Sequence, residues 1–462
     1  MKKFNYISIT MLFIILFSSC TKESLNPYLD NETTTDNAVK TSEDIRLLAN
    51  GMYKLMRATE YYGRDFIIYG EVRSDNTFSN GNSGRFVTVG QMIMNNQDGY
   101  AGGTFSAIYK PIASANIIIN SNVTGDADEI KHIKGEALAV RALCHFDLVK
   151  LFGQQHVSGQ GGMNALGVAY VTKYHGELVN PSRETVAQNK AMIYADLDAA
   201  IANLSNSFDD SSKLTITTTA AHAIKSRVAT YFGDWSIAKT ESEWVINNGG
   251  LSAATASNFV SSFGLNNPSG NKIFELASTT TDSNGINGLA NIYRGSSYGD
   301  IVVLDDLKNT FGTTDVRGSA SMIKIISGKL RNSGKYPTGS PYNDNIKVIR
   351  YEEIILNYAE ALYRLNPSDS NALTQLNIIP SRRNATLYTT VTEDNILLER
   401  RKELCFEGFR FYDLARTGRN IPLVSSTQQT HGGVTYGSYK YAFPIPYKEM
   451  YSNTNAIQNF GY

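Results

Sequence analysis

The chain has 462 residues, which is enough to bury a large core and to hold two or more lobes. Lys plus Arg and Asp plus Glu each total 43, so no overall electric field favours nucleic acid or an anionic membrane surface. The three cysteines, Cys20, Cys144 and Cys405, provide no disulfide framework.

Residues 1–19 have the pattern of a secretory signal peptide. A basic pair, a short apolar run over residues 7–17 and two serines precede Cys20. The apolar run is too short to span a bilayer. A Cys directly after small residues resembles the bacterial lipoprotein box, in which that Cys is lipidated, although a plain signal peptide that happens to contain Cys20 is the alternative. We predict lipidation of Cys20 and a polar tether over residues 20–41.

Apolar residues at helical spacing predict helical regions along the rest of the chain. These regions cover residues 42–59, 105–152, 185–248 and 348–417. Within the third region, Gly233 lies between two helical patterns, with aromatic residues before it and small residues after it. This arrangement resembles the helix–turn–helix unit of tetratricopeptide (TPR) repeats.

Three segments lose the helical period and are rich in Asn, Ser, Gly and Thr: residues 60–104, 154–184 and 250–347. The first is predicted as loops and short strands, and the third contains strand patterns at residues 272–277, 301–304 and 322–326. Long irregular segments on a rigid helical scaffold tend to carry binding. The predicted fold is therefore mostly α, a single domain over residues 42–462. A TPR-like scaffold of helical pairs (an α-α superhelix) carries long irregular loop and short-strand insertions that form the ligand-binding side.

Residues 393–418 are predicted as one amphipathic helix that Gly418 ends. Arg401 falls within its apolar register, so it needs a carboxylate partner. The candidate partners in the same segment are Glu399, Glu403, Glu407 and Asp413. Gly408 removes side-chain bulk, which predicts a close approach of another helix at that position.

Catalytic and metal-binding motifs are nearly absent from the sequence. The six His residues are scattered, and neither a metal site nor a cofactor is predicted, although a Ca²⁺ ion that stabilises a loop stays open. Residues 295–299 match the Gly-x-Ser-x-Gly nucleophile elbow, with Ser297 as nucleophile and His431 as a later base. The elbow needs a helix after the serine, whereas residues 301–304 are strand-like. A serine hydrolase is therefore only an alternative, and no catalytic residue is predicted.

Aromatic and polar residues gather in the first and third insertions. Sugar rings stack on aromatic faces while their hydroxyls bond to Asn, Asp and Arg. The chain has 27 Tyr and 2 Trp, and both Trp lie in the TPR-like unit, where we assign them to packing. The alternative for each insertion residue is packing of a loop on the scaffold. The predicted ligand-binding residues are Arg73, Asp75, Asn76, Arg85, Phe86, Tyr100, Tyr293, Arg294 and Tyr298.

Several segments, in order along the chain, resemble the SusD/RagB family. Residues 399–418 read Glu-Arg-Arg-Lys-Glu-Leu-x-Phe-Glu-Gly-x-Arg-x-x-Asp-Leu-x-Arg-Thr-Gly, which is similar to that family's C-terminal signature. The remaining matches are residues 135–142 and 233–235 in the TPR-like helices, residues 348–361 in the penultimate helix, residues 442–446 and 458–462 in the closing segment, and Cys20. The resemblance therefore spans nearly the whole chain.

The resemblance implies a non-catalytic lipoprotein on the outer surface of a Gram-negative outer membrane. Such a protein captures nutrient for a SusC-like TonB-dependent transporter, which its TPR helices face, and needs neither cofactor nor nucleic acid. The ligand implied is an oligosaccharide for most relatives and a peptide for a RagB-like minority. Residues 399–418 are scaffold in such proteins. A TPR-type adaptor that makes only protein contacts is a further alternative.

Overall fold

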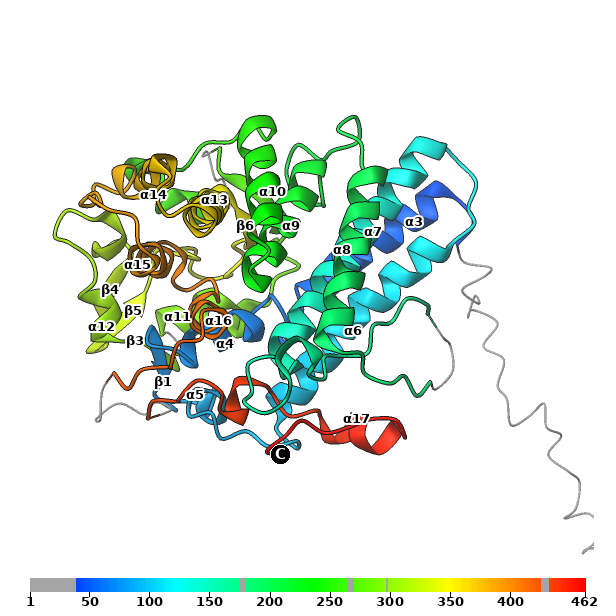
Figure 1. Ribbon diagram of the computed structural model, residues 1–462, viewed down its shortest axis with the longest axis horizontal. Helices are drawn as coiled ribbons and strands as arrows, with labels where there is room; N and C mark the ends of the chain where they lie inside the picture. Colours follow the sequence, from blue (N-terminus) through cyan, green and yellow to red (C-terminus); the bar gives the residue numbers. More distant parts are fainter. Residues whose placement is uncertain (1–38, 175–178, 265–269, 296–297, 425–431) are drawn as a thin grey trace, which may run out of the picture. The chain divides into compact units, whose positions relative to one another are not determined.

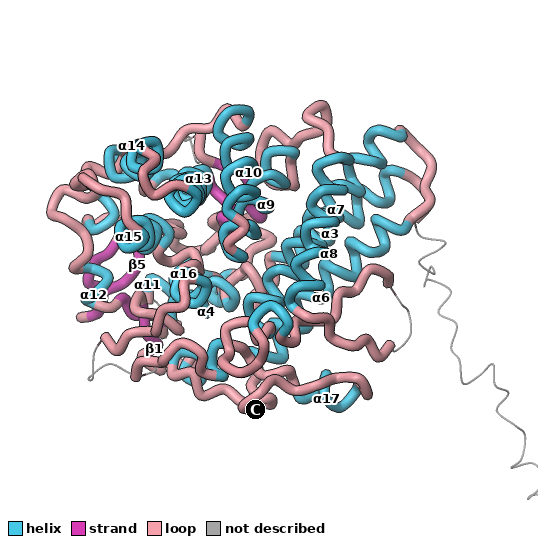
Figure 2. The backbone as a smooth tube through the Cα atoms, viewed as in Figure 1, coloured by secondary structure: helices cyan, strands magenta, loops and turns pink. Residues whose placement is uncertain are grey.

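Helices make up about half of this computed structural model, which describes residues 39–174, 179–264, 270–295, 298–424 and 432–462 (Figure 1). Residues 41–462 form one unit. Helices dominate one side of this unit, whereas the short strands and longer loops gather on the other (Figure 2). The mostly α fold class with a TPR-like scaffold is thus confirmed.

Four helices form the first part of the scaffold, and they lie side by side at the right of Figure 1: α3 (Ser42–Met56), α6 (Gly99–Asn120), α7 (Ala127–Phe152) and α8 (Val186–Asn203). Side chains fix where these helices begin. Thr41 and Asp44 form a capping box at the start of α3, and Asp126 accepts two backbone N–H bonds at the start of α7.

The second part of the scaffold begins with the predicted TPR-like unit. Helix α9 (Thr218–Phe232) ends at Gly233, whose φ of 74° is readily adopted by glycine, and α10 (Trp235–Asn248) follows. Helix α10 packs on α13 (Tyr351–Leu365), which also contacts α14 (Ser370–Ser381) and α15 (Glu393–Leu404). Tandem helical pairs thus bury their apolar faces against their neighbours.

The single helix predicted over residues 393–418 is broken in two. Helix α15 ends at Leu404, and α16 (Arg410–Arg416) starts after a turn in which Phe406 and Gly408 have φ of 69° and 85°. The cause is tertiary, because this turn lies against α4 (Asp65–Val72), where a Cβ on Gly408 would come within 3.0 Å of the Ile67 backbone. The predicted close approach of another helix is therefore confirmed, although Gly408 lies in a turn.

The first insertion contains more helix than predicted. It holds α4, every residue of which is buried, and the short α5 (Val87–Gly90), whereas loops and short strands were expected. A helix that is buried on all sides has no polar face, so its sequence shows no helical alternation of apolar and polar residues. The prediction for residues 60–104 is corrected accordingly.

Strands in the described residues pair as three two-stranded antiparallel sheets: β1 (Thr77–Ser79) with β3 (Ile301–Val303), β2 (Lys272–Leu276) with β6 (Ile346–Arg350), and β4 (Ile323–Ile326) with β5 (Lys329–Asn332). Short helices α11 (Leu289–Arg294), α12 (Asp305–Lys308) and α17 (Tyr447–Ser452) complete the fold. In the first sheet Phe78 pairs with Val302, so the first and third insertions meet there.

Buried ion pairs hold α15 in place. The carboxylate of Glu403 is fully buried and lies 2.7 Å from both Arg350 and Arg383. Burial alone would raise the pKa of Glu403, but the charges of Arg383 and Arg350 hold it far below its usual range. Arg401 does have carboxylate partners, but they are Asp306 at 2.7 Å and Asp75 at 3.3 Å rather than the four predicted candidates.

Candidate functional site

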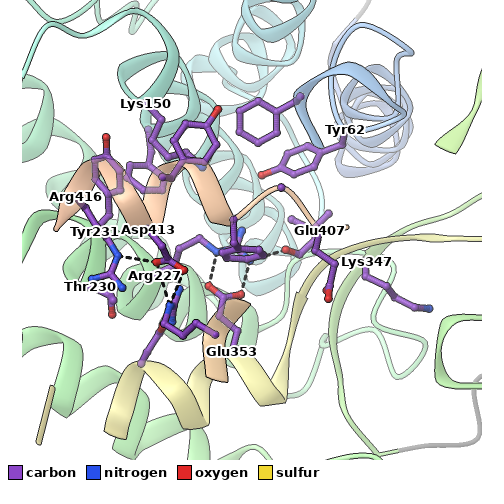
Figure 3. Close-up of a pocket in the computed structure, with 18 residues that line it drawn as sticks. Tyr62, Lys150, Arg227, Thr230, Tyr231, Lys347, Glu353, Glu407, Asp413 and Arg416 are labelled. Carbon is purple, nitrogen blue, oxygen red and sulfur yellow. Dashed lines mark hydrogen bonds and ion pairs between the residues drawn. The ribbon is translucent and has the colours of Figure 1, made fainter. Parts of the chain in front are cut away.

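A small polar cavity lies in the middle of the scaffold, lined by residues of α7, α9, α13 and α16 (Figure 3). Its volume is about 40 Å³, which gives room for a few water molecules rather than for a sugar or a peptide. Its charged side chains are held in ion pairs; for example, Arg227 lies 2.5 Å from Glu353 and Asp413 lies 2.8 Å from Arg416. We therefore assign this cavity to the scaffold.

Five of the nine predicted ligand-binding residues are buried in the scaffold: Arg73, Asp75, Asn76, Phe86 and Tyr293. The Asp75 carboxylate accepts two hydrogen bonds from Arg410, at 2.7 and 2.8 Å. The Arg73 guanidinium lies 3.7 Å from the centre of the Phe411 ring. Arg73 and Asp75 thus fasten the first insertion to the C-terminal region. Because all five side chains are buried, a ligand at the surface does not reach them, and the set of candidate ligand-binding residues becomes smaller.

Two further predicted residues are half-buried and hold loops in position. The Tyr100 hydroxyl accepts a hydrogen bond from the Phe86 backbone N–H at 2.9 Å, and the two rings stack with centroids 4.9 Å apart. Arg294 donates a hydrogen bond to the backbone carbonyl of Pro337. These contacts assign Tyr100 and Arg294 to the packing of loops on the scaffold, which is the alternative to ligand binding for each insertion residue.

The last two predicted residues, Arg85 and Tyr298, come together at the surface. The guanidinium carbon of Arg85 lies 3.7 Å from the centre of the Tyr298 ring, and both side chains are partly exposed. One belongs to the first insertion and the other to the third. Their meeting follows from the pairing of β1 with β3, which places Ser79 opposite Ile301.

Two neighbours that the sequence did not single out fix this arrangement. The fully buried carboxylate of Asp300 accepts from the backbone N–H of Ser83 at 2.8 Å and from its hydroxyl at 2.5 Å. Arg85 in turn donates to the Ser83 hydroxyl at 2.7 Å. In the sequence, the only indication of a role for Asp300 is its position directly before the strand predicted at residues 301–304. We call Ser83, Arg85 and Tyr298 the Arg85–Tyr298 surface, which the buried Asp300 supports.

This surface offers hydrogen bonding and an aromatic ring rather than acid–base chemistry. A guanidinium donates up to five N–H bonds, and a Tyr ring gives a flat apolar face. The described residues bring together no group of three His, Cys, Asp or Glu side chains able to hold a metal ion. Ser297, His431 and Cys20, which the sequence singled out, lie outside the part of the chain that the structure describes.

Two family models match separate parts of the chain. Residues 27–230 match the model described as "Starch-binding associating with outer membrane", and residues 299–462 match the model described as "SusD family". The chain belongs to the SusD/RagB family. The resemblance noted from residues 399–418 is therefore confirmed, and those residues form α15, α16 and the turn between them.

Relatives in this family match either nearly the whole chain or one part of it. The SusD-like protein P2 of Formosa agariphila is 23% identical over 99% of both chains, and the starch-binding protein SusD of Bacteroides thetaiotaomicron is 33% identical over 32% of this chain and 28% of its own. A crystal structure of a putative sugar-binding protein from Bacteroides vulgatus superposes with a TM-score of 0.82, at 28% identity, and covers 93% of this chain and 100% of that one.

No helix in the described residues is both long enough and apolar enough to cross a bilayer.

Proposed function

We propose that this member of the SusD/RagB family is a non-catalytic oligosaccharide-binding protein that passes its ligand to a SusC-like TonB-dependent transporter. Family membership carries the proposal, since the names of two relatives describe a starch-binding and a sugar-binding protein rather than enzymes. The Arg85–Tyr298 surface is consistent with it. Neither of these two relatives is named as a peptide-binding protein or as a hydrolase, so a RagB-like peptide ligand and a hydrolase that uses Ser297 have no support from them.

The proposal includes attachment of the protein to the outer membrane. The description of the first matching family model, which names association with the outer membrane, supports this location. We propose that the lipid is carried by Cys20 and that residues 20–41 tether a single domain, residues 42–462, at the cell surface. One lipid chain binds a membrane only weakly, so we expect a stable anchor to need the several acyl chains of a lipoprotein.

Arg85 and Tyr298 are the residues that we propose contact the sugar. Arg85 covers one face of the Tyr298 ring, so a pyranose ring would stack on the rest of that aromatic surface. The fork of N–H groups on Arg85 matches a pair of neighbouring hydroxyls. Asp300 holds both loops in place before binding, which lowers the entropy that the loops lose when a ligand binds.

The test is isothermal titration against a panel of oligosaccharides, including malto-oligosaccharides, and a panel of peptides. We expect oligosaccharide binding, and we expect Arg85→Ala and Tyr298→Ala each to weaken it about ten-fold or more. The matched control is Arg419→Ala, because Arg419 is also a partly exposed arginine but pairs with Asp394 on another surface. Melting temperatures of all three variants should stay within about 2 °C of the wild type.

Three outcomes would contradict the proposal. Binding to peptides alone would show that the ligand is a peptide, as in the RagB-like alternative, rather than an oligosaccharide. Equal affinities for Arg85→Ala, Tyr298→Ala and Arg419→Ala would place the sugar elsewhere on the protein. Labelling of Ser297 by a fluorophosphonate probe would show an activated serine and contradict a purely binding role.

A further inference from the structure

A groove of about 1300 Å³ runs along one side of α6, and no residue of the Arg85–Tyr298 surface lines it. Residues of α6 between Gly99 and Ala113 form its floor. Residues 169–171 and 179–181 form one wall, and residues 446–453, which include α17, form the other. We call it the α6 groove. Typical small-molecule pockets measure roughly 300–1,000 Å³, so this groove has room for a chain of several units.

Hydrogen bonds hold both walls of the groove in place. The Tyr109 hydroxyl, from the floor, donates to the backbone carbonyl of Ala169 in the first wall at 2.9 Å. The side-chain amide of Asn453, from the second wall, donates to the backbone carbonyl of Pro181 in the first, also at 2.9 Å. The groove is therefore built into the fold, and a ligand would meet a surface that is already ordered.

The floor of the groove is kept bare by glycines that the backbone does not require. A Cβ on Gly99 would meet no heavy atom of the described residues within 4 Å, and one on Gly102 would first meet Pro446 at 3.9 Å. Neither glycine has the positive φ that excludes other residues. Glycine costs a helix interior about 1 kcal/mol relative to alanine. Its effect here is to let a flat ring lie directly against the helix.

The chemistry of the lining suits a neutral ligand that has both apolar faces and hydroxyl groups. Tyr447, which is 51% exposed, and Phe105 supply aromatic surface, while Asn96 and Gln97 supply amide groups. Charges along the groove nearly balance: Glu60, Asp98 and Glu449 against Lys110 and Lys448. A strongly charged chain of either sign would thus meet like charges as well as opposite ones.

An extended peptide fits this groove less well than a sugar does. Peptides that bind in extended form pair their backbone with a free strand edge. The floor here is a helix, whose backbone groups beyond the first turn are mostly bonded within α6. In the second wall, the N–H of Tyr447 already donates to the Asn96 carbonyl at 2.7 Å, and Pro446 has no N–H to offer.

We propose that the α6 groove is a second oligosaccharide-binding site, separate from the Arg85–Tyr298 surface. The ligand class rests on the proposed function, whereas the existence of the site rests on the groove itself. A long oligosaccharide, or two short ones, would then engage the protein at two places. Two sites joined in one body raise the overall affinity for a long chain without any new contact.

The test fills the groove with a side chain and counts sugar molecules bound. Gly102→Leu places a leucine on the floor, and Gly51→Leu is the matched control, because Gly51 is an exposed glycine of α3 whose Cβ would also meet no described atom within 4 Å. Titration uses a short oligosaccharide from the panel that binds the wild type. We expect two equivalents for the wild type and for Gly51→Leu, and one for Gly102→Leu. Arg85→Ala should remove the other equivalent.

The outcomes separate this inference from the proposed function. If the wild type binds no oligosaccharide of the panel, both the proposed function and the second binding site are contradicted. If the wild type binds one equivalent that Arg85→Ala abolishes and Gly102→Leu leaves intact, the second site alone is overturned. It is also overturned if Gly102→Leu leaves sugar binding unchanged but weakens capture by the transporter, since the groove would then dock protein.

Discussion

Gly408 shows how one residue serves the scaffold. Its φ of 85° lies in the left-handed region, and its N–H donates to the buried Glu71 carboxylate at 2.8 Å. The contact is reciprocal, because a Cβ on Gly70 of α4 would come within 2.1 Å of the Gly408 carbonyl oxygen. Two glycines thus allow α4 and the turn between α15 and α16 to touch backbone to backbone.

We expect Gly408→Ala to destabilise the protein by about 3 kcal/mol, because strain at positive φ adds to a clash with the Ile67 backbone. Gly418→Ala is the matched control. Gly418 also has a positive φ, 69°, but the first atom its Cβ would meet, on Tyr436, is 3.9 Å away. It should therefore cost only about 1 kcal/mol. Urea unfolding measures both values, and equal losses would contradict the role of the close contact. Oligosaccharide affinity of the folded protein should not change.

At the scale of elements, α7 and the loop after it are joined through His145. Its Nδ1 bonds to the Arg141 carbonyl at 2.9 Å, and its Nε2 accepts from the Val171 backbone N–H at 3.0 Å, so the ring is neutral in the folded protein. The ring is fully buried and stacks on Tyr170 with centroids 3.8 Å apart. Burial, together with the Arg141 charge, lowers the pKa of His145 to about 3.

This pKa predicts a loss of stability in mild acid. In the unfolded chain His145 is protonated below about pH 6.5, whereas in the folded chain it stays neutral down to about pH 3. The contribution of neutral His145 to the free energy of unfolding is therefore fully present above about pH 6.5. It falls by up to about 1.4 kcal/mol per pH unit between these two pH limits. Urea unfolding at pH 7.5 and at pH 5 measures the free energy of unfolding. We expect its change between the two pH values to be smaller for His145→Gln than for the wild type.

The comparison with the variant isolates His145 from other groups that titrate in the same range. Asp65, for example, has its pKa raised to about 6 by burial, against the opposing charge of Arg64. Both proteins carry that carboxyl, so its effect cancels in the difference. Identical pH dependence of the two proteins would contradict the assignment to His145.

At the scale of the whole molecule, the proposed lipid on Cys20 decides where the folded unit works. We expect Cys20→Ser to abolish incorporation of labelled palmitate and to release the protein from the membrane fraction of the cell. Cys405→Ser is the control, because Cys405 is buried and its thiol donates to the Lys402 carbonyl, a bond that a serine hydroxyl can replace. Retention of Cys20→Ser protein in the membrane fraction would contradict the anchor.

Local patterns in the sequence determined much of this fold. The amphipathic period placed the scaffold helices, because each buries one face against its neighbour, and Gly233 marked the turn between α9 and α10. The strand at Ile301–Val303 followed from its β-branched residues. The family was also readable from the sequence, since residues 399–418 carry its signature in one continuous segment.

The tertiary structure alone decided which residues of the insertions face solvent. A buried arginine such as Arg73 and a surface one such as Arg85 look alike in sequence, because burial depends on partners that lie far along the chain. For the same reason the sequence predicts loops and short strands where α4 lies buried on all sides. It also predicts one continuous helix over residues 393–418, although contact with α4 breaks that helix after α15. The sequence determined the periodic elements, where neighbours in the chain suffice. Only the folded structure brought Arg85 to Tyr298, because a pairing of β1 with β3 has no local signal.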